Sequence, residues 1–329
     1  MLVYPEDHSY RGSSLWRDYV LVRKLRSLRT GVLITTRPAL NLLAAELAPS
    51  GLVTVGQEHL NLGTYKPGLA GEIAHRYPKL DAVGVLTEDD LSGYANVLAR
   101  DSTRVVHIPN AVPRLEGGSS TLSSPLVVAA GRLTPQKGFD LLIEAFAHVV
   151  ERHSDWRLHI YGSGEKLEEL RKLIFERELY NNVFLMGRAR ELGREFERAS
   201  VFALSSRFEG LPMVLLEAMS KRLPVVSFDC PTGPRQVVTH GRDGLLVPNG
   251  DIGAFAMSLL ELIEDASKRR RMGDAALETA GRYDIQVVGQ QWADLLRELT
   301  GAAPGVGPIE VNGAGVGRRK NVSLTTSER

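Results

Sequence analysis

The sequence predicts an α/β fold with two doubly wound parallel-sheet domains, the first of them incomplete. Short apolar runs rich in Val, Ile and Leu alternate with longer amphipathic stretches along the 329 residues, and this alternation is typical of βαβ units. Because the runs are apolar at nearly every position, we expect strands buried on both faces, in parallel sheets covered by helices. The expected strands are 31–35, 52–55, 82–86, 105–108, 126–130, 158–161, 183–186, 201–204, 224–228 and 245–247.

The stretch PNAVPRLEGGSSTLSSP, between Ile108 and Leu126, divides the chain. It is rich in Pro, Gly and Ser, so it continues neither a helix nor a central strand and indicates an interdomain linker. The final segment is Gly-rich and has no apolar period, which predicts disorder. We therefore expect a first domain at 1–119, a second at 120–283, a helix at 284–300 that packs back on the first domain, and a disordered tail at 301–329.

Composition and charge exclude several classes of protein. With 40 basic and 39 acidic residues, the net charge of +1 gives no global attraction to nucleic acid. The single cysteine, Cys230, excludes an internal disulfide and a Cys-rich metal site. No run approaches the ~20 apolar residues that span a bilayer, and we expect a cytoplasmic protein. The basic stretch Arg17–Arg29 is either a solvated helix face or a peripheral contact with the inner face of the membrane.

The strongest local signal is SSRFEGLPMVLLEAM, which follows a strand and contains a turn and a helix. Pro212 suits the first helical position, and the amides of Gly210 and Leu211 would then be free to face an anion. Glu209 lies in the turn and Glu217 lies about 12 Å further along the helix, too far for both to act on one small centre. The two carboxylates would serve separate groups of an extended ligand, although each alone could be a capping or solvated residue.

Two further turns follow strands and open helices. In AAGRLTPQKGF, Gly131 permits a tight exit from the strand. Arg132 and Lys137 then place two cations at the carboxyl end of the sheet, where open α/β folds bind ligands and where a diphosphate would suit them. Taken alone, the two could equally be a solvated pair of loop residues. In YGSGEK, Gly162 permits close approach of the backbone to a ligand, but a lone G-x-G can equally cap a helix.

In the first half of the chain, His59 lies just beyond a strand, in LVTVGQEHLNLG. A histidine there is either a catalyst or a satisfied loop residue. The acidic residues Glu88, Asp89 and Asp90 follow Thr87; this order favours a helix start over a metal site. Since no D-x-D motif stands in a convincing context, we expect no metal.

Taken together, GRLTPQKG, YGSGEK, NVFLMGR, the Glu209-x7-Glu217 motif, GPRQVV and DGLLVP resemble the retaining glycosyltransferases of family 4. The resemblance implies a GT-B fold of two Rossmann-like domains facing a cleft, and the QEH stretch resembles the branch that builds surface polysaccharides. It implies that Glu209 holds the transferred sugar, that Glu217 binds the ribose and that Arg132 and Lys137 bind the diphosphate. It implies a donor site at Gly131, Arg132, Lys137, Gly162, Arg188, Ala189, Gly210, Leu211, Pro212 and Glu217, with Glu209 and His59 as catalytic residues.

The resemblance also implies the reaction. A hexose-type sugar would pass with retention from a nucleoside-diphosphate donor, by default a UDP-sugar, to a hydroxyl of a glycan, lipid-linked or small-molecule acceptor. No metal, other cofactor or nucleic acid is expected. The family's opening strands and Gly-rich turn have no counterpart before Gly31, so we expect a truncated first domain and compromised activity. A related phosphorylase, a nucleotide-sugar epimerase and a noncatalytic nucleotide-sugar-binding protein stay open.

Overall fold

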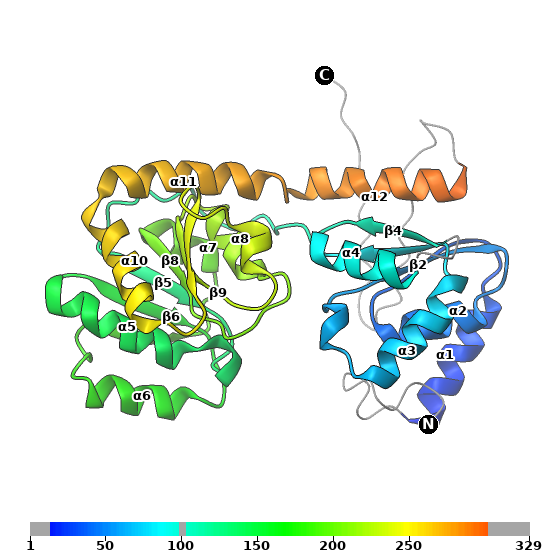
Figure 1. Ribbon diagram of the computed structural model, residues 1–329, viewed down its shortest axis with the longest axis horizontal. Helices are drawn as coiled ribbons and strands as arrows, with labels where there is room; N and C mark the ends of the chain where they lie inside the picture. The colour runs from blue at the N-terminus through cyan, green and yellow to red at the C-terminus, as the bar shows by residue number, and fades with distance from the viewer. Residues whose placement is uncertain (1–13, 99–102, 302–329) are drawn as a thin grey trace, which may run out of the picture.

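The computed structural model describes residues 14–98 and 103–301, and Figure 1 shows two sheet domains side by side. The first sheet has the order β1-β2-β3-β4 and the second the order β10-β9-β8-β5-β6-β7. Their strands are β1 (Gly31–Thr35), β2 (Leu52–Gln57), β3 (Ala82–Val85), β4 (Arg104–His107), β5 (Leu126–Ala130), β6 (Arg157–Tyr161), β7 (Val183–Gly187), β8 (Val201–Leu204), β9 (Val225–Asp229) and β10 (Gly244–Pro248). All the strand pairs within these two sheets are parallel. The predicted α/β class and all ten predicted strands are confirmed.

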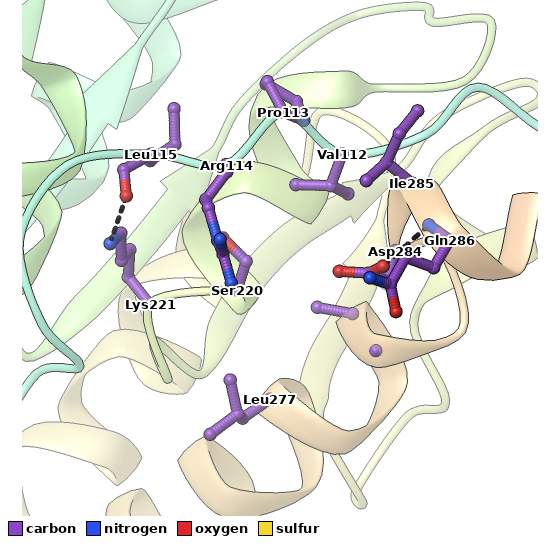
Figure 2. A pocket seen from close by; sticks show the side chains of 12 residues that line it. Val112, Pro113, Arg114, Leu115, Ser220, Lys221, Leu277, Asp284, Ile285 and Gln286 are labelled. Carbon is purple, nitrogen blue, oxygen red and sulfur yellow. Dashed lines mark hydrogen bonds between the residues drawn. The ribbon is translucent and has the colours of Figure 1, made fainter. Parts of the chain in front are cut away.

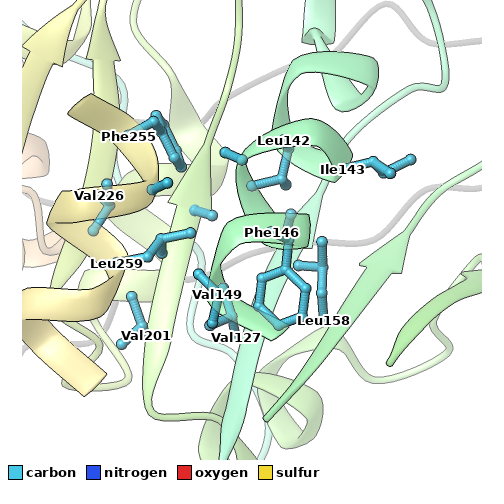
Figure 3. Packing of buried hydrophobic residues seen from close by; sticks show 14 of the residues in the cluster. Val127, Leu142, Ile143, Phe146, Val149, Leu158, Val201, Val226, Phe255 and Leu259 are labelled. Carbon is cyan, nitrogen blue, oxygen red and sulfur yellow. The ribbon is translucent and has the colours of Figure 1, made fainter. Parts of the chain in front are cut away.

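Helices cover both faces of the second sheet. They are α5 (Phe139–Arg152), α6 (Leu167–Glu176), α7 (Leu192–Arg198), α8 (Met213–Met219), α9 (Pro234–Val237), α10 (Ile252–Glu264) and α11 (Ala266–Gly281). Val127 packs with α5 and α10 on one face, where Phe146 and Phe255 fill the core (Figure 3). The next residue, Val128, packs with α7, α8 and α11 on the other face. Because successive side chains of a strand point to opposite faces, β5 is buried on both, as its sequence predicts.

The first domain is smaller. Its helices are α1 (Leu15–Ser27), α2 (Pro38–Leu47), α3 (Pro67–Arg76) and α4 (Glu88–Val97), with short 3₁₀ turns η2 (Leu62–Thr64) and η3 (Tyr77–Lys79). One prediction fails here: β1 is not buried on both faces, since Val32 is 37% and Ile34 41% exposed. The reason is its position at the edge of a four-stranded sheet, where the covering layers end.

The last helix returns to the first domain. After α11, helix α12 (Ile285–Thr300) runs across to the first sheet (Figure 1). Its Val288 packs in one buried cluster with Val55 of β2. The ring of its Trp292 would lie 3.6 Å from a Cβ built on Gly84 of β3. The first sheet is therefore covered on this face by residues from the far end of the chain. The predicted disordered tail, 301–329, lies outside the described residues except for Gly301, which is the C-cap of α12.

The two interdomain connections lie side by side. The amide of Val112 donates to the carbonyl of Tyr283 at 2.8 Å, and Val112 forms a parallel bridge with Asp284. The linker is also held on the second domain, because the buried ammonium of Lys221 donates to the carbonyls of Leu115 at 3.0 Å and Gly117 at 2.8 Å. Burial lowers the pKa of Lys221. A cavity of about 410 Å³ opens between the linker, Lys221 and the start of α12 (Figure 2).

Candidate active site

A cleft of about 870 Å³ separates the carboxyl-end loops of the second sheet from the first domain. It brings His59 of the first domain together with Arg132, Glu209 and Gly210 of the second. A Cβ built on Gly210 would lie 3.6 Å from the carbonyl oxygen of His59, so the two domains touch at these residues. The cleft is lined by Thr36, Arg37, Pro38, His59, Leu60, Asn61, Thr64, Tyr65, Lys66, Leu69, Arg132, Gln136, Phe208, Glu209 and Gly210.

Glu209 and Lys137 form an ion pair at the edge of this cleft. Lys137 Nζ donates to Glu209 Oε1 at 2.5 Å, and the two side chains are 14% and 7% exposed. Ser206 Oγ donates to the same oxygen at 2.6 Å. Within the described residues Glu209 Oε2 accepts no hydrogen bond, and Lys137 keeps two further N–H donors. The pair can therefore offer one acceptor to a sugar hydroxyl and two donors to a phosphate at the same time.

Three glycine turns pack together beneath the pair. A Cβ on Gly131 would lie 3.3 Å from Cδ of Lys137, so glycine leaves room for Lys137 to lie across the exit of β5. Gly162 has φ +150°, and a Cβ there would lie 1.8 Å from the carbonyl oxygen of Gly131. The amide of Gly162 donates to the carbonyl of Gly187 at 2.7 Å. The close backbone approach predicted for Gly162 is thus an approach to neighbouring loops, and it joins the turns that follow β5, β6 and β7.

Hydrogen-bond donors that have no described partner lie in the cleft and next to it. Arg132 is exposed to it, and no described residue forms an ion pair or hydrogen bond with the guanidinium. The hydrogen bonds of the described chain likewise include none donated by the amides of Gly210 and Leu211. A guanidinium and two backbone amides are groups that bind phosphate oxygens.

Of the ten predicted donor residues, two, Arg132 and Gly210, line this cleft. The other eight lie outside its lining: Gly131, Lys137, Gly162, Arg188, Ala189, Leu211, Pro212 and Glu217. Arg188, in the loop after β7, donates through Nε to Ser163 Oγ at 2.7 Å. Ala189 is half-buried against the core of the second domain. Helix α8 begins at Met213 and Pro212 is its N-cap, so the prediction that Pro212 is the first helical residue is wrong by one position.

Glu217, on the short helix α8, is half-buried, and its carboxylate has no hydrogen bond or ion pair with the described residues. Burial raises its pKa. A carboxylate that is partly buried without a hydrogen-bond partner is destabilised, and hydroxyl hydrogen bonds donated by a ligand would lower its free energy. The side chain is therefore suited to a polyol such as a ribose.

His59 is exposed to the cleft. Its pKa is lowered, first by partial burial of the ring and then by the positive charge of Arg37. Both causes favour the neutral imidazole, which can donate one hydrogen bond and accept another.

Sequence reasoning missed three residues around His59. Arg37 and Lys66 line the cleft, and each directly precedes the proline that begins a helix, a recognisable helix-start signal. Glu58 is only 1% exposed and lies buried beneath the residues that line the first-domain side of the cleft. It accepts hydrogen bonds from Asn41 Nδ2 at 2.7 Å and from the hydroxyl of Tyr65 at 2.6 Å. The sequence places Glu58 at the end of a strand without indicating that it is buried.

The acidic run after Thr87 begins α4, as the capping interpretation predicts. The side chain of Thr87 accepts a hydrogen bond from the amide of Asp90, and its hydroxyl donates to Asp90 Oδ2 at 2.7 Å. Across residues 14–98 and 103–301, no group of three or more His, Cys, Asp or Glu side chains is arranged to hold a metal ion. In the same part of the chain, every helix is too short or too polar to cross a bilayer.

Known proteins share this architecture. Residues 119–279 match the family described as glycosyl transferases group 1. The chain is 39% identical over 287 residues to an exopolysaccharide phosphotransferase of Streptomyces coelicolor, covering 86% of this chain and 30% of that protein. It is 26% identical over 296 residues to an uncharacterized glycosyltransferase of Haemophilus influenzae, covering 86% and 82% of the two chains.

A solved structure of a Staphylococcus aureus TarM mutant, in complex with fondaparinux, alpha-GlcNAc-glycerol and UDP, superposes with a TM-score of 0.71 at 25% identity. The match covers 84% of this chain and 58% of that one, so the chain spans less than two thirds of both TarM and the Streptomyces relative. Residues 119–279, which hold the second sheet, are therefore similar to the family of glycosyl transferases group 1, and the chain has the two-sheet α/β fold of its GT-B structural neighbours.

Proposed function

We propose that the chain transfers a hexose-type sugar, with retention, from a UDP-sugar to an acceptor hydroxyl in the synthesis of a surface glycan. The observation that carries the proposal is the Lys137–Glu209 pair at the edge of the interdomain cleft, with Arg132 free beside it and His59 across from it. The TarM neighbour, which is structurally similar over most of this chain, was solved with UDP and a glycosylated glycerol, and this supports a nucleotide donor here.

The donor would lie along the loops of the second domain. Arg132, the two remaining N–H groups of Lys137 and the amides of Gly210 and Leu211 would bind the diphosphate. Glu217 would accept hydrogen bonds from the ribose hydroxyls, and the loop carrying Arg188 and Ala189 would lie beside the base. Because these donors are fixed before the reaction, they would stabilise the charge that develops on the leaving diphosphate without reorganisation.

In the reaction, the bond between the anomeric carbon and the phosphate oxygen breaks, and its electron pair leaves with UDP. The acceptor oxygen forms the new bond on the same face of the sugar, and its proton passes to the departing phosphate. Glu209 Oε2 and neutral His59 would position the sugar hydroxyls. No metal or other cofactor takes part in this proposal. Closure of the cleft about the paired connections at Val112 and Tyr283 would exclude water.

The proposal includes a cytoplasmic location with a peripheral contact at the inner face of the membrane, through α1. This helix packs against α2 and exposes Trp16 and Tyr19, whose ring centroids are 5.7 Å apart. Arg23 and Lys24 are exposed on the same helix. Exposed aromatic side chains beside cations are suited to an anionic lipid surface.

Calorimetry with UDP, followed by an assay for UDP release from UDP-sugars, tests the function. We expect the wild type to bind UDP and the Arg132→Ala/Lys137→Ala variant to lose at least tenfold in affinity, equivalent to 1.4 kcal/mol. Arg171→Ala/Lys172→Ala, on the exposed face of α6, removes the same charge and should leave binding unchanged.

Acceptor-dependent UDP release supports transfer. UDP binding without release under any condition would instead indicate a noncatalytic binding protein. Release that requires inorganic phosphate would indicate a phosphorylase, and sugar epimers formed without an acceptor would indicate an epimerase. Failure of the wild type to bind UDP would overturn the donor site itself.

A further inference from the structure

We infer that the acceptor carries phosphate groups next to the hydroxyl that receives the sugar, and that Arg37 and Lys66 bind them. The inference rests on the proposed function and specifies the class of its second substrate. It is carried by the charges on the first-domain wall of the cleft, which the donor does not use.

That wall is positive and has no carboxylate. Ten first-domain residues line the cleft; Arg37 and Lys66 are cations, and none of the ten is Asp or Glu. Both cations are exposed, and no described residue forms a hydrogen bond or ion pair with either side-chain head group. Glu58 does not neutralise them at the surface, because it is buried behind the wall and hydrogen-bonded to Asn41 and Tyr65.

The proposed function assigns these two cations no role with the donor. It gives the diphosphate of the UDP-sugar to Arg132 and Lys137, which lie on the opposite domain. When a ligand fills the cleft, Arg37 and Lys66 lose part of their contact with water, and this costs free energy unless the ligand brings negative charge. An acceptor with phosphate groups supplies that charge on the required side.

The surroundings of the two cations support the same ligand. Arg37 and Lys66 directly precede α2 and α3, two ten-residue helices that begin with proline and have no side-chain hydrogen bond at the N-cap. No described side chain therefore competes for the amides of the first turn of either helix, and the positive end of each helix dipole adds to the charge of the cation beside it. The side-chain acceptors on this wall, such as Asn61 and Thr64, are uncharged, so they can bind the hydroxyls of an acceptor but leave the two cations without a counter-charge.

The wall also has a place for the uncharged part of the acceptor. Leu60 is 55% exposed on the first-domain side, and Phe208 is 56% exposed on the second-domain side of the same cleft. Apolar side chains at this position can pack against the carbon faces of a sugar or polyol. The acceptor we infer is thus a polyol or sugar chain that carries phosphate esters.

The test measures binding of fluorescein-labelled oligo(glycerol phosphate) by anisotropy, in the presence of UDP, to the full chain and to Arg37→Gln/Lys66→Gln. Labelled oligoglycerol without phosphate is the neutral control ligand, and Arg171→Gln/Lys172→Gln is the control variant of equal charge change. A farnesyl-diphosphate-linked sugar is assayed in parallel, because the phosphate can belong to a polymer or to a lipid carrier. UDP affinity is measured separately by calorimetry on each variant.

We expect the wild type to bind a phosphate-bearing probe at least tenfold more tightly than the neutral one, with weaker binding at higher salt. Arg37→Gln/Lys66→Gln should remove this preference while leaving UDP affinity within twofold. The probe that binds more tightly identifies the source of the phosphate. Equal affinity for the phosphate-bearing and neutral probes, or a double variant that loses UDP affinity instead, would overturn the inference. UDP binding by the wild type is measured separately and tests the donor site alone. Its absence would contradict the proposed function, whereas its presence without a preference for phosphate would contradict only this inference.

Discussion

Lys137 donates a 2.5 Å hydrogen bond to Glu209, although 72 residues separate them in the chain. The bond joins the turn after β5 to the turn after β8, and these two strands are neighbours in the second sheet. Since both side chains are largely buried, the cation expected to hold the diphosphate and the carboxylate expected to hold the sugar form a single electrostatic unit. Neither can be removed without changing the other.

Substitution of Lys137 and substitution of Glu209 should have different effects on UDP binding and on catalysis. Lys137→Met leaves the Glu209 carboxylate with only Ser206 as a described donor, so we expect UDP affinity to fall at least tenfold and the free energy of unfolding to fall by about 1–3 kcal/mol. Glu209→Gln keeps an oxygen acceptor for Lys137 and should bind UDP within about threefold of wild type, while kcat falls about 10²–10³-fold. Calorimetry, urea unfolding and UDP release measure these three quantities. Equal loss of UDP affinity in both variants would contradict the division of roles.

Glu217→Gln should make the protein more stable and less able to bind UDP. Burial raises the pKa of this carboxyl, so the folded state holds its proton more tightly than the unfolded chain does. Stability therefore falls as the pH rises through that raised pKa, and at neutral pH the unpartnered carboxylate is a cost. We expect Tm at pH 7 to rise by about 1–3 °C and UDP affinity to fall about 5–30-fold. A lower Tm together with unchanged UDP affinity would show that Glu217 has only a structural role.

Arg37→Gln should raise the pKa of His59. The Arg37 charge contributes to the low pKa of this imidazole, and partial burial, the larger cause, stays in the variant. The pKa should therefore move upward without passing the ordinary value near 6.5. Imidazole proton shifts followed by NMR against pH give the pKa directly, and the acid limb of kcat/KM should move to higher pH with it. Arg29→Gln, outside the cleft lining, is the matched control, and an equal shift in that control would refute the assignment.

Gly162→Ala should destabilise the second domain far more than Gly241→Ala. Both glycines have positive φ, so alanine introduces backbone strain at each. A Cβ at Gly241 would meet nothing within 4 Å, whereas one at Gly162 would lie 1.8 Å from the Gly131 carbonyl oxygen. We expect a loss of about 1 kcal/mol for Gly241→Ala and at least about 3 kcal/mol for Gly162→Ala, measured by urea unfolding. Similar losses at the two sites would mean that the turns are not packed as described.

Trp16→Ala should weaken binding to anionic vesicles. The side chain is 70% exposed on α1, so its removal should not affect folding. We expect flotation with phosphatidylglycerol vesicles to decrease several-fold and thermal stability to stay unchanged. Phe175→Ala on α6 removes an aromatic side chain of similar exposure from the second domain and serves as the control. Wild-type protein that does not float with anionic vesicles would remove the membrane contact from the proposal.

The sequence predicts the ten strands because each is a short apolar run bounded by turn residues. This pattern can be read from neighbouring residues alone. It does not predict the exposure of Val32 in β1, because edge position and helix cover are decided by tertiary packing. Lys137 and Glu209 are both predicted as site residues, but their ion pair is not, since strand order brings their loops together. Arg37 and Lys66 are missed because a cation before a helix-initiating proline is common, and only the fold places both on one wall.

The return of α12 to the first domain also affects the order of events during synthesis. Val55 of β2 leaves the ribosome early, whereas Val288, which packs in its cluster, is made near the end of the described chain. The second sheet, complete at Pro248, can close over α5 and α10 before that point. The domain translated first is therefore the one whose core is finished last, and until α12 emerges its apolar sheet face is a natural binding site for chaperones.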